Sequence, residues 1–126
     1  FSWGKKLHVY DAYDREAAFI KQELFAFLPS YQVFVGDRQA ARIVKEFSFL
    51  FPRYSIEMLG WQIEGSFMAH DYAITKNGRT IVTIHKEWMT WGDCYELDIE
   101  NPADELIALA VVLTIDCVIA NSNNNN

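Results

Sequence analysis

The sequence predicts a mainly β domain, in which antiparallel strands form a meander that curls into a barrel around one C-terminal helix. Three observations predict this fold class: a sequence unit that occurs three times, a strict polar–apolar alternation in each copy, and a final segment that is apolar all round. Aromatic residues make up 15% of the chain, and they favour pleated, half-buried surfaces. The strands are therefore expected to come first and the helix last.

The repeated unit has the frame Ile-x-x-Glu-apolar, then a bulky apolar residue, then Tyr-x-apolar-x-apolar. Its copies occupy residues 20–35, 43–58 and 84–99 and align without a gap. The second half of each copy alternates with a period of two, which is the signature of a strand. We interpret the chain as an antiparallel meander of long, bent strands.

About nine strands are expected, joined by short turns. The clearest turn is Asn77-Gly78, because both residues accept the positive φ that a tight hairpin requires. The expected strands lie near residues 6–11, 17–24, 31–35, 40–47, 54–59, 61–65, 67–75, 80–88 and 95–99.

One position in each copy conflicts with the alternation. Gln22, Lys45 and Lys86 fall on the same face as their apolar neighbours. Either three polar side chains point inward, or a bulge or bend resets the face there. We favour the bend, because Pro or Gly follows shortly afterwards in each copy.

The helix is expected over residues 103–120, buried on all sides. Asn101 suits the N-cap, and Pro102 suits the first helical position. From Leu106 onward the sequence is apolar around the whole helical wheel, so every face needs a cover. A can of about eleven strands is wide enough to hold such a helix.

The domain is expected to span residues 1–120, followed by a polar tail at residues 121–126. Residues 1–9 align with residues 89–97, without the Ile-x-x-Glu half that should precede them. We therefore expect that the domain lacks its first strands and that the intact protein carries them. If it does not, a homodimer would cover the open edge, because unpaired edges invite pairing.

Composition excludes several classes of protein. Seventeen acidic residues against eleven basic ones give a net charge of −6, which argues against a nucleic-acid partner. Two cysteines make no disulfide framework, and from the first residues we expect no secretory leader. The longest apolar stretch, residues 106–120, is too short to span a membrane and contains an acid. We expect a cytoplasmic protein.

Few side chains suggest chemistry. His70 and Asp71 could serve a metal or acid–base site, but neighbours in a strand point to opposite faces. Asp116 is more unusual, because it lies late in an apolar helix, where the helix dipole disfavours an acid. It marks either a site at the barrel mouth or, as we favour, a structural carboxylate that accepts hydrogen bonds from the backbone, a Lys or an Arg. No metal and no cofactor are expected.

Basic residues at strand ends or turns are the other candidates for a site. On one rim they would offer contacts to anionic lipid or nucleotide, although such a set is more often a solvated face. They are Lys5, Lys6, Arg15 and Arg38.

Three segments resemble the LURP-one-related proteins: Gly-Trp-Gln-Ile-Glu-Gly-Ser-Phe-Met-Ala-His-Asp-Tyr at residues 60–72, together with residues 88–99 and 109–120. The resemblance implies the tubby C-terminal-like fold, a twelve-stranded barrel around a C-terminal hydrophobic helix. Tubby domains bind phosphoinositides, and the related scramblases act at membranes. No tubby lipid motif matches this chain, so no lipid-binding residue is transferred. The bacterial LURP-one-like proteins that it resembles have no established activity.

The leading hypothesis is a non-catalytic intracellular binding or scaffold module with an unidentified ligand. One alternative is a hydrolase or other small-molecule enzyme that uses His70, Asp71 or Asp116 at a barrel mouth. Another is a weak binder of anionic lipid or phosphoinositide, which should release vesicles at moderate salt because its net charge is −6.

Overall fold

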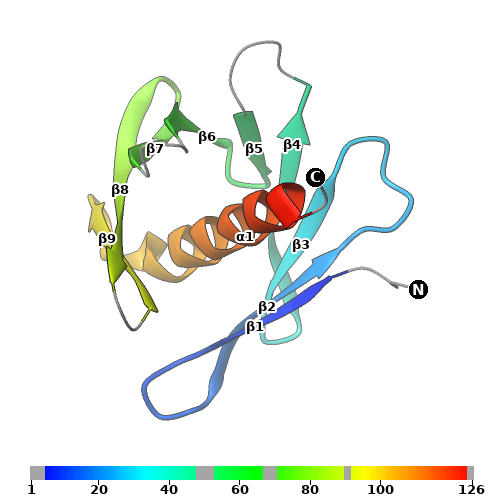
Figure 1. Cartoon of the computed structure of the whole chain (residues 1–126), viewed down its shortest axis with the longest axis horizontal. Helices are drawn as coiled ribbons and strands as arrows, with labels where there is room; N and C mark the ends of the chain where they lie inside the picture. The colour runs from blue at the N-terminus through cyan, green and yellow to red at the C-terminus, as the bar shows by residue number, and fades with distance from the viewer. Residues whose placement is uncertain (1–4, 48–52, 67–70, 90–91, 125–126) are drawn as a thin grey trace.

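The computed structural model describes residues 5–47, 53–66, 71–89 and 92–124 (Figure 1). Within them the chain forms strands, a short 3₁₀ helix η1 (Pro102–Asp104) and an α-helix α1 (Glu105–Asn124). The strands are β1 (Lys6–Tyr10), β2 (Glu16–Gln22), β3 (Ser30–Val35), β4 (Arg38–Glu46), β5 (Arg53–Glu57), β6 (Trp61–Ser66), β7 (Asp71–Lys76), β8 (Arg79–Met89) and β9 (Gly92–Ile99).

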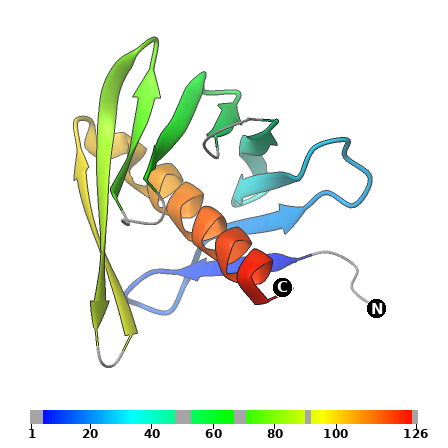
Figure 2. The ribbon, with the colours of Figure 1, turned by 45° about the horizontal axis from the view of Figure 1, so that its top comes forward.

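The strands form one sheet in which each strand pairs antiparallel with the next along the chain, from β1 to β9. This arrangement confirms the mainly β fold class and the meander. The sheet curls around α1, which runs across its inner side in both views (Figures 1 and 2). It does not close, because β1 and β9 are its two edges. The architecture is consistent with a tubby-like fold.

Hairpin turns gather at one end of the sheet, where α1 also begins. Asn77 (φ 52°) and Gly78 (φ 78°) both adopt positive φ between β7 and β8, as the sequence predicted. Because consecutive strands run in opposite directions, strands β2, β4, β6 and β8 terminate at the other end. The two ends therefore differ: tight turns occupy one, and the β2–β3 loop occupies the other.

The core lies between the inner face of the sheet and α1. Alternate strand residues such as Val33, Ile43 and Ile56 are fully buried, as are Val112 and Ile115 of the helix. The alternation in the repeats therefore does mark the buried face. Asn101 caps η1 as expected, since its side chain accepts a hydrogen bond from the Ala103 amide at 3.1 Å.

The expectation that the helix is buried on all sides is wrong. One set of its apolar side chains is only half-buried, because the open sheet does not cover every face of α1. These residues are Leu106, Ile107, Leu109 and Leu113. The helix also continues to Asn124, so the first residues of the expected polar tail are helical. No helix in the described ranges combines the length and apolar character that crossing a membrane would require.

The preferred bend is also wrong for the third repeat. β8 runs unbroken past Lys86, and its pairing with β9 shows no register shift there. The Lys86 side chain points inward and is only 5% exposed. In the first two repeats the strand ends at or just after the conflicting residue, and Gln22 and Lys45 are half-buried. Of these three conflicting residues, Lys86 is therefore the one that carries its polar group into the core.

Candidate functional site

The inward side chain of Lys86 meets Asp116 of α1. The Lys86 Nζ atom donates to Asp116 Oδ1 at 2.7 Å and lies 5.6 Å from the centre of the Tyr95 ring. Asp116 is half-buried. The favoured interpretation of Asp116 named a Lys or Arg partner, and the structure supplies Lys86. This ion pair ties the helix to β8.

The inner face of the sheet buries Tyr31, Tyr54 and Tyr72, and the last of these lies near Asp116. Burial raises the pKa of Tyr54 to about 12. Burial also raises the pKa of Tyr72, and the nearby charge of Asp116 raises it further. Burial likewise raises the pKa of Tyr31. These hydroxyls stay protonated at neutral pH, so they can donate hydrogen bonds but cannot act as bases.

The inner polar groups are therefore engaged in holding the fold together. Among the side chains that the structure describes, no buried nitrogen or oxygen lacks a hydrogen-bond partner. Such satisfaction is what a stable interior requires. The inner face of the sheet binds the helix.

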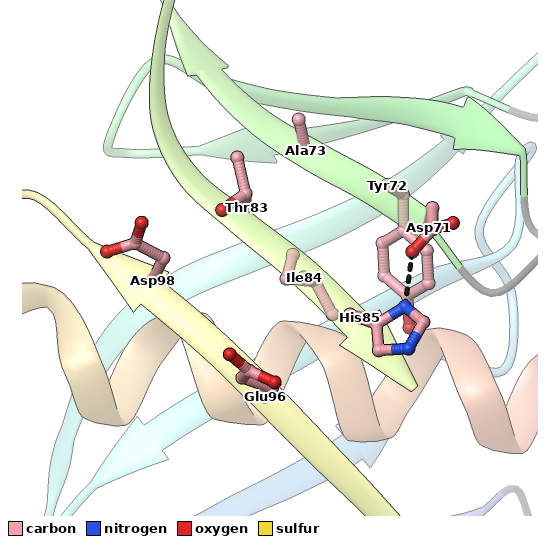
Figure 3. Close-up of a pocket in the computed structure, with 8 residues that line it drawn as sticks. All are labelled: Asp71, Tyr72, Ala73, Thr83, Ile84, His85, Glu96 and Asp98. Carbon is pink, nitrogen blue, oxygen red and sulfur yellow. Dashed lines mark hydrogen bonds and ion pairs between the residues drawn. The ribbon is translucent and has the colours of Figure 1, made fainter. Parts of the chain in front are cut away.

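A hollow of about 600 Å³ lies over β7, β8 and β9 and is open to solvent (Figure 3). Strand pairing builds it: His85 lies opposite Asp71 on one side and Glu96 on the other, while Thr83 lies between Ala73 and Asp98. Most of these side chains point outward. The lining residues are Asp71, Tyr72, Ala73, Thr83, Ile84, His85, Glu96 and Asp98.

His85 is the central ionisable group of the hollow. Its Nδ1 atom lies 2.5 Å from Asp71 Oδ1, and its Nε2 atom lies 3.7 Å from Glu87 Oε1. The hydrogen bond to Asp71 is the main reason that the pKa of His85 is raised, and the charges of Asp71, Glu87 and Glu96 add to it. The ring is stabilised as a cation, with a carboxylate facing each nitrogen.

The two acid–base candidates that the structure describes, Asp71 and Asp116, do not share a site. Asp71 faces outward beside His85, whereas Asp116 lies on the inner side of the sheet. His70 lies outside the described residues. The sheet itself separates Asp71 from Asp116, because Tyr72, the residue after Asp71, is the one that points inward toward Asp116.

The basic candidates do not share a rim either. Arg15 and Arg38 lie in or beside the turns at one end of the sheet, and Arg15 Nε pairs with Asp11 Oδ2 at 3.1 Å. Lys5 and Lys6 lie at the start of β1, at the opposite end. The antiparallel course of the strands separates the two pairs.

The sequence analysis named Asp71 and Asp116 as site candidates but not their partners, His85 and Lys86. The signal for Lys86 was present, because its inward position was one of the two alternatives. His85, Glu96 and Asp98 alternate on the polar face of the third repeat, but only the pairing of β7 with β8 and β9 brings them beside Asp71. Within the described ranges, no group of three or more His, Cys, Asp or Glu residues is placed to hold a metal.

The profile of the LURP-one-related family matches residues 1–116. A curated relative, "Uncharacterized protein YxjI" of Bacillus subtilis (strain 168), is 29% identical over 126 residues, which cover 100% of this chain and 78% of the relative. No solved structure matches the chain. Since the family profile spans almost the whole sequence, this chain belongs to the LURP-one-related family.

Proposed function

We propose that this domain is a non-catalytic binding module whose ligand occupies the hollow over β7, β8 and β9. The observation that carries the proposal is the position of the His85 ring, because each of its two nitrogens faces a carboxylate. A general base needs a free nitrogen directed at its substrate. The hydrogen bond to Asp71 favours the protonated ring of His85, and it holds both side chains in place on the wall of the hollow.

The inner side of the sheet supports the same proposal. The Lys86–Asp116 ion pair and the buried apolar side chains join α1 to the strands. Ligand sites are concave and need space beside a few convergent polar groups. The hollow on the outer face has both, with carboxylates on β7 and β9 and the Thr83 hydroxyl between them.

The lining favours a cationic ligand group, such as an amine or a guanidinium. Glu96 and Asp98 are exposed, and on β8 they lie opposite His85 and Thr83, respectively. A net charge of −6 strengthens the attraction of a cation at low salt. Such binding should weaken as salt screens the charges.

An NMR titration tests this proposal. A short arginine-rich peptide should shift the amide signals of Thr83, His85, Glu96 and Asp98, and a glutamate-rich peptide of equal length should not. The double variant Glu96→Gln/Asp98→Asn should lose the shifts. The matched control is Asp14→Asn/Asp37→Asn, which removes two exposed acids in the β1–β2 and β3–β4 turns.

Equal loss in the control and the double variant would contradict the proposal, because it would show that only the total charge matters. Shifts confined to other strands would also contradict it.

The enzyme alternative has one observation in its favour, the 2.5 Å contact between His85 and Asp71 inside a hollow. If His85 were catalytic, a panel of activated esters would be hydrolysed by the protein and not by His85→Gln. Turnover that depends on His85 would replace the binding proposal with a hydrolase.

A further inference from the structure

The loop between β2 and β3, residues 23–29, holds aromatic side chains out in water. Phe25 is 98% exposed and Phe27 is 100% exposed, and Phe47, directly after β4, is 89% exposed. Single exposed apolar residues are common, but a group of bare rings at one place marks an interaction surface. We call Leu24, Phe25, Phe27 and Phe47 the aromatic tip.

Hydrogen bonds hold the base of this tip. The Glu23 amide donates to the Ser30 carbonyl at 2.8 Å and closes the loop, and the Lys45 amide donates to the Pro29 carbonyl at 2.9 Å. Arg42 reaches both ends, with Nε 2.6 Å from Glu23 Oε2 and Nη2 3.3 Å from Ser30 Oγ. The tip is thus presented from a braced base, beside the end of β4.

The charges around the tip are mainly positive, although the whole chain is acidic. Lysines flank it on three strands, and Lys6 pairs directly with Lys21 across β1 and β2. Of the neighbouring carboxylates, Glu23 is paired with Arg42, whereas Glu46 keeps its charge and accepts a hydrogen bond from the Ser55 hydroxyl. The flanking lysines are Lys5, Lys6, Lys21 and Lys45.

We propose that the aromatic tip and its flanking lysines bind the surface of an anionic lipid bilayer. Rings that protrude from a loop fit a deformable surface, and apolar side chains gain free energy when they leave water for the headgroup boundary. The lysines complement the negative lipid surface. Contact at the tip leaves α1 in the core. This inference goes beyond the binding proposal and uses none of the residues that line the hollow.

Vesicle co-sedimentation of the intact chain tests the inference. The protein should pellet with phosphatidylcholine vesicles that contain phosphatidylserine and much less with phosphatidylcholine alone. Phe25→Ala/Phe27→Ala should weaken binding by about tenfold or more. The matched control is Tyr13→Ala, since Tyr13 is 79% exposed in the β1–β2 turn at the opposite end of the sheet (Figure 1).

A second arm tests the charges. Each of Lys6→Gln and Lys21→Gln should weaken binding to the anionic vesicles by about fivefold. Arg38→Gln, which removes a charge at the opposite end, should leave it unchanged.

Three results would overturn the inference: no binding to either vesicle, equal binding to both, or the same loss in Tyr13→Ala as in the tip variant. If vesicles do not bind and the tip variant instead abolishes self-association in light scattering, the tip is a contact between copies of this chain. Thermal melting checks that each variant is folded. Phe27→Ala alone keeps the test available should the double variant melt early, because the Phe27 ring is fully exposed.

Discussion

A lysine buried in an apolar core needs a charged partner, and Asp116 is the partner of Lys86. The 2.7 Å ion pair satisfies a buried ammonium group and joins the last strand pair to the helix. A buried ion pair is weak evidence for stability, because desolvation offsets its attraction. Removing one partner is different, since it strands the other charge.

Lys86→Ala is therefore expected to lower the free energy of unfolding by about 3 kcal/mol. Lys86→Met/Asp116→Leu should recover most of that loss, because no charge is left without its partner. Urea denaturation of Lys86→Met, Asp116→Leu and the double variant that combines them measures the coupling. Additive losses would show that the pair contributes nothing specific.

His85 makes stability depend on pH. Its pKa is raised above the ordinary value of 6.5, chiefly by the hydrogen bond to Asp71. The unfolded chain binds this proton less tightly than the folded chain, so His85 stabilises the fold fully below about pH 6.5. The stabilisation is lost as pH rises through the higher pKa of the folded state.

The stability difference between wild type and His85→Gln should therefore shrink as the pH rises from below 6.5. NMR titration of the His85 ring gives the folded pKa, and Asp71→Asn should return it toward 6.5. An unchanged ring pKa in Asp71→Asn would show that the hydrogen bond is not the cause.

At the scale of elements, α1 has a covered side and a partly covered side. Ile115 is fully buried, whereas Leu109 is half-buried. The cost of a truncation depends on the cavity that it leaves. Truncating each of these two residues of α1 therefore compares its covered side with its partly covered side.

Ile115→Ala is expected to cost about 2–5 kcal/mol, and Leu109→Ala clearly less. Thermal and urea denaturation of both variants checks this order. Equal losses would mean that the sheet covers both sides of α1 alike, and hence that it closes around the helix.

At the scale of the whole molecule, the open sheet leaves two strand edges and a half-buried stripe on the helix. β1 and β9 each pair with one neighbour. Unpaired edges offer backbone groups to another chain, and apolar area beside them adds to the gain.

The 126-residue chain is therefore expected to self-associate in a concentration-dependent manner. Sedimentation velocity over a range of concentrations measures this. The association should persist at high salt, because backbone pairing and apolar burial are not screened as surface charges are. A single monomeric species at every concentration would contradict the expectation.

The sequence by itself determined the local structure of this protein. Period-two alternation and turn residues predicted nine strands close to their observed positions, because strand faces and tight turns depend on neighbouring residues. Asn101 and Pro102 marked the start of the helical segment for the same reason. The repeat also marked the anomalous position of Lys86, but its favoured explanation was wrong there, since the partner that allows a buried lysine lies thirty residues further on, in α1.

Only the tertiary structure decided where the chemistry lies. Asp71, His85 and Glu96 come together because β8 pairs with β7 on one side and β9 on the other, and their register depends on contacts distant in sequence. The basic candidates lie at opposite ends of the sheet because consecutive strands run in opposite directions. One side of α1 is only partly covered because the sheet does not close. A pattern of residues specifies which face is apolar, whereas the pairing of strands specifies which polar groups meet.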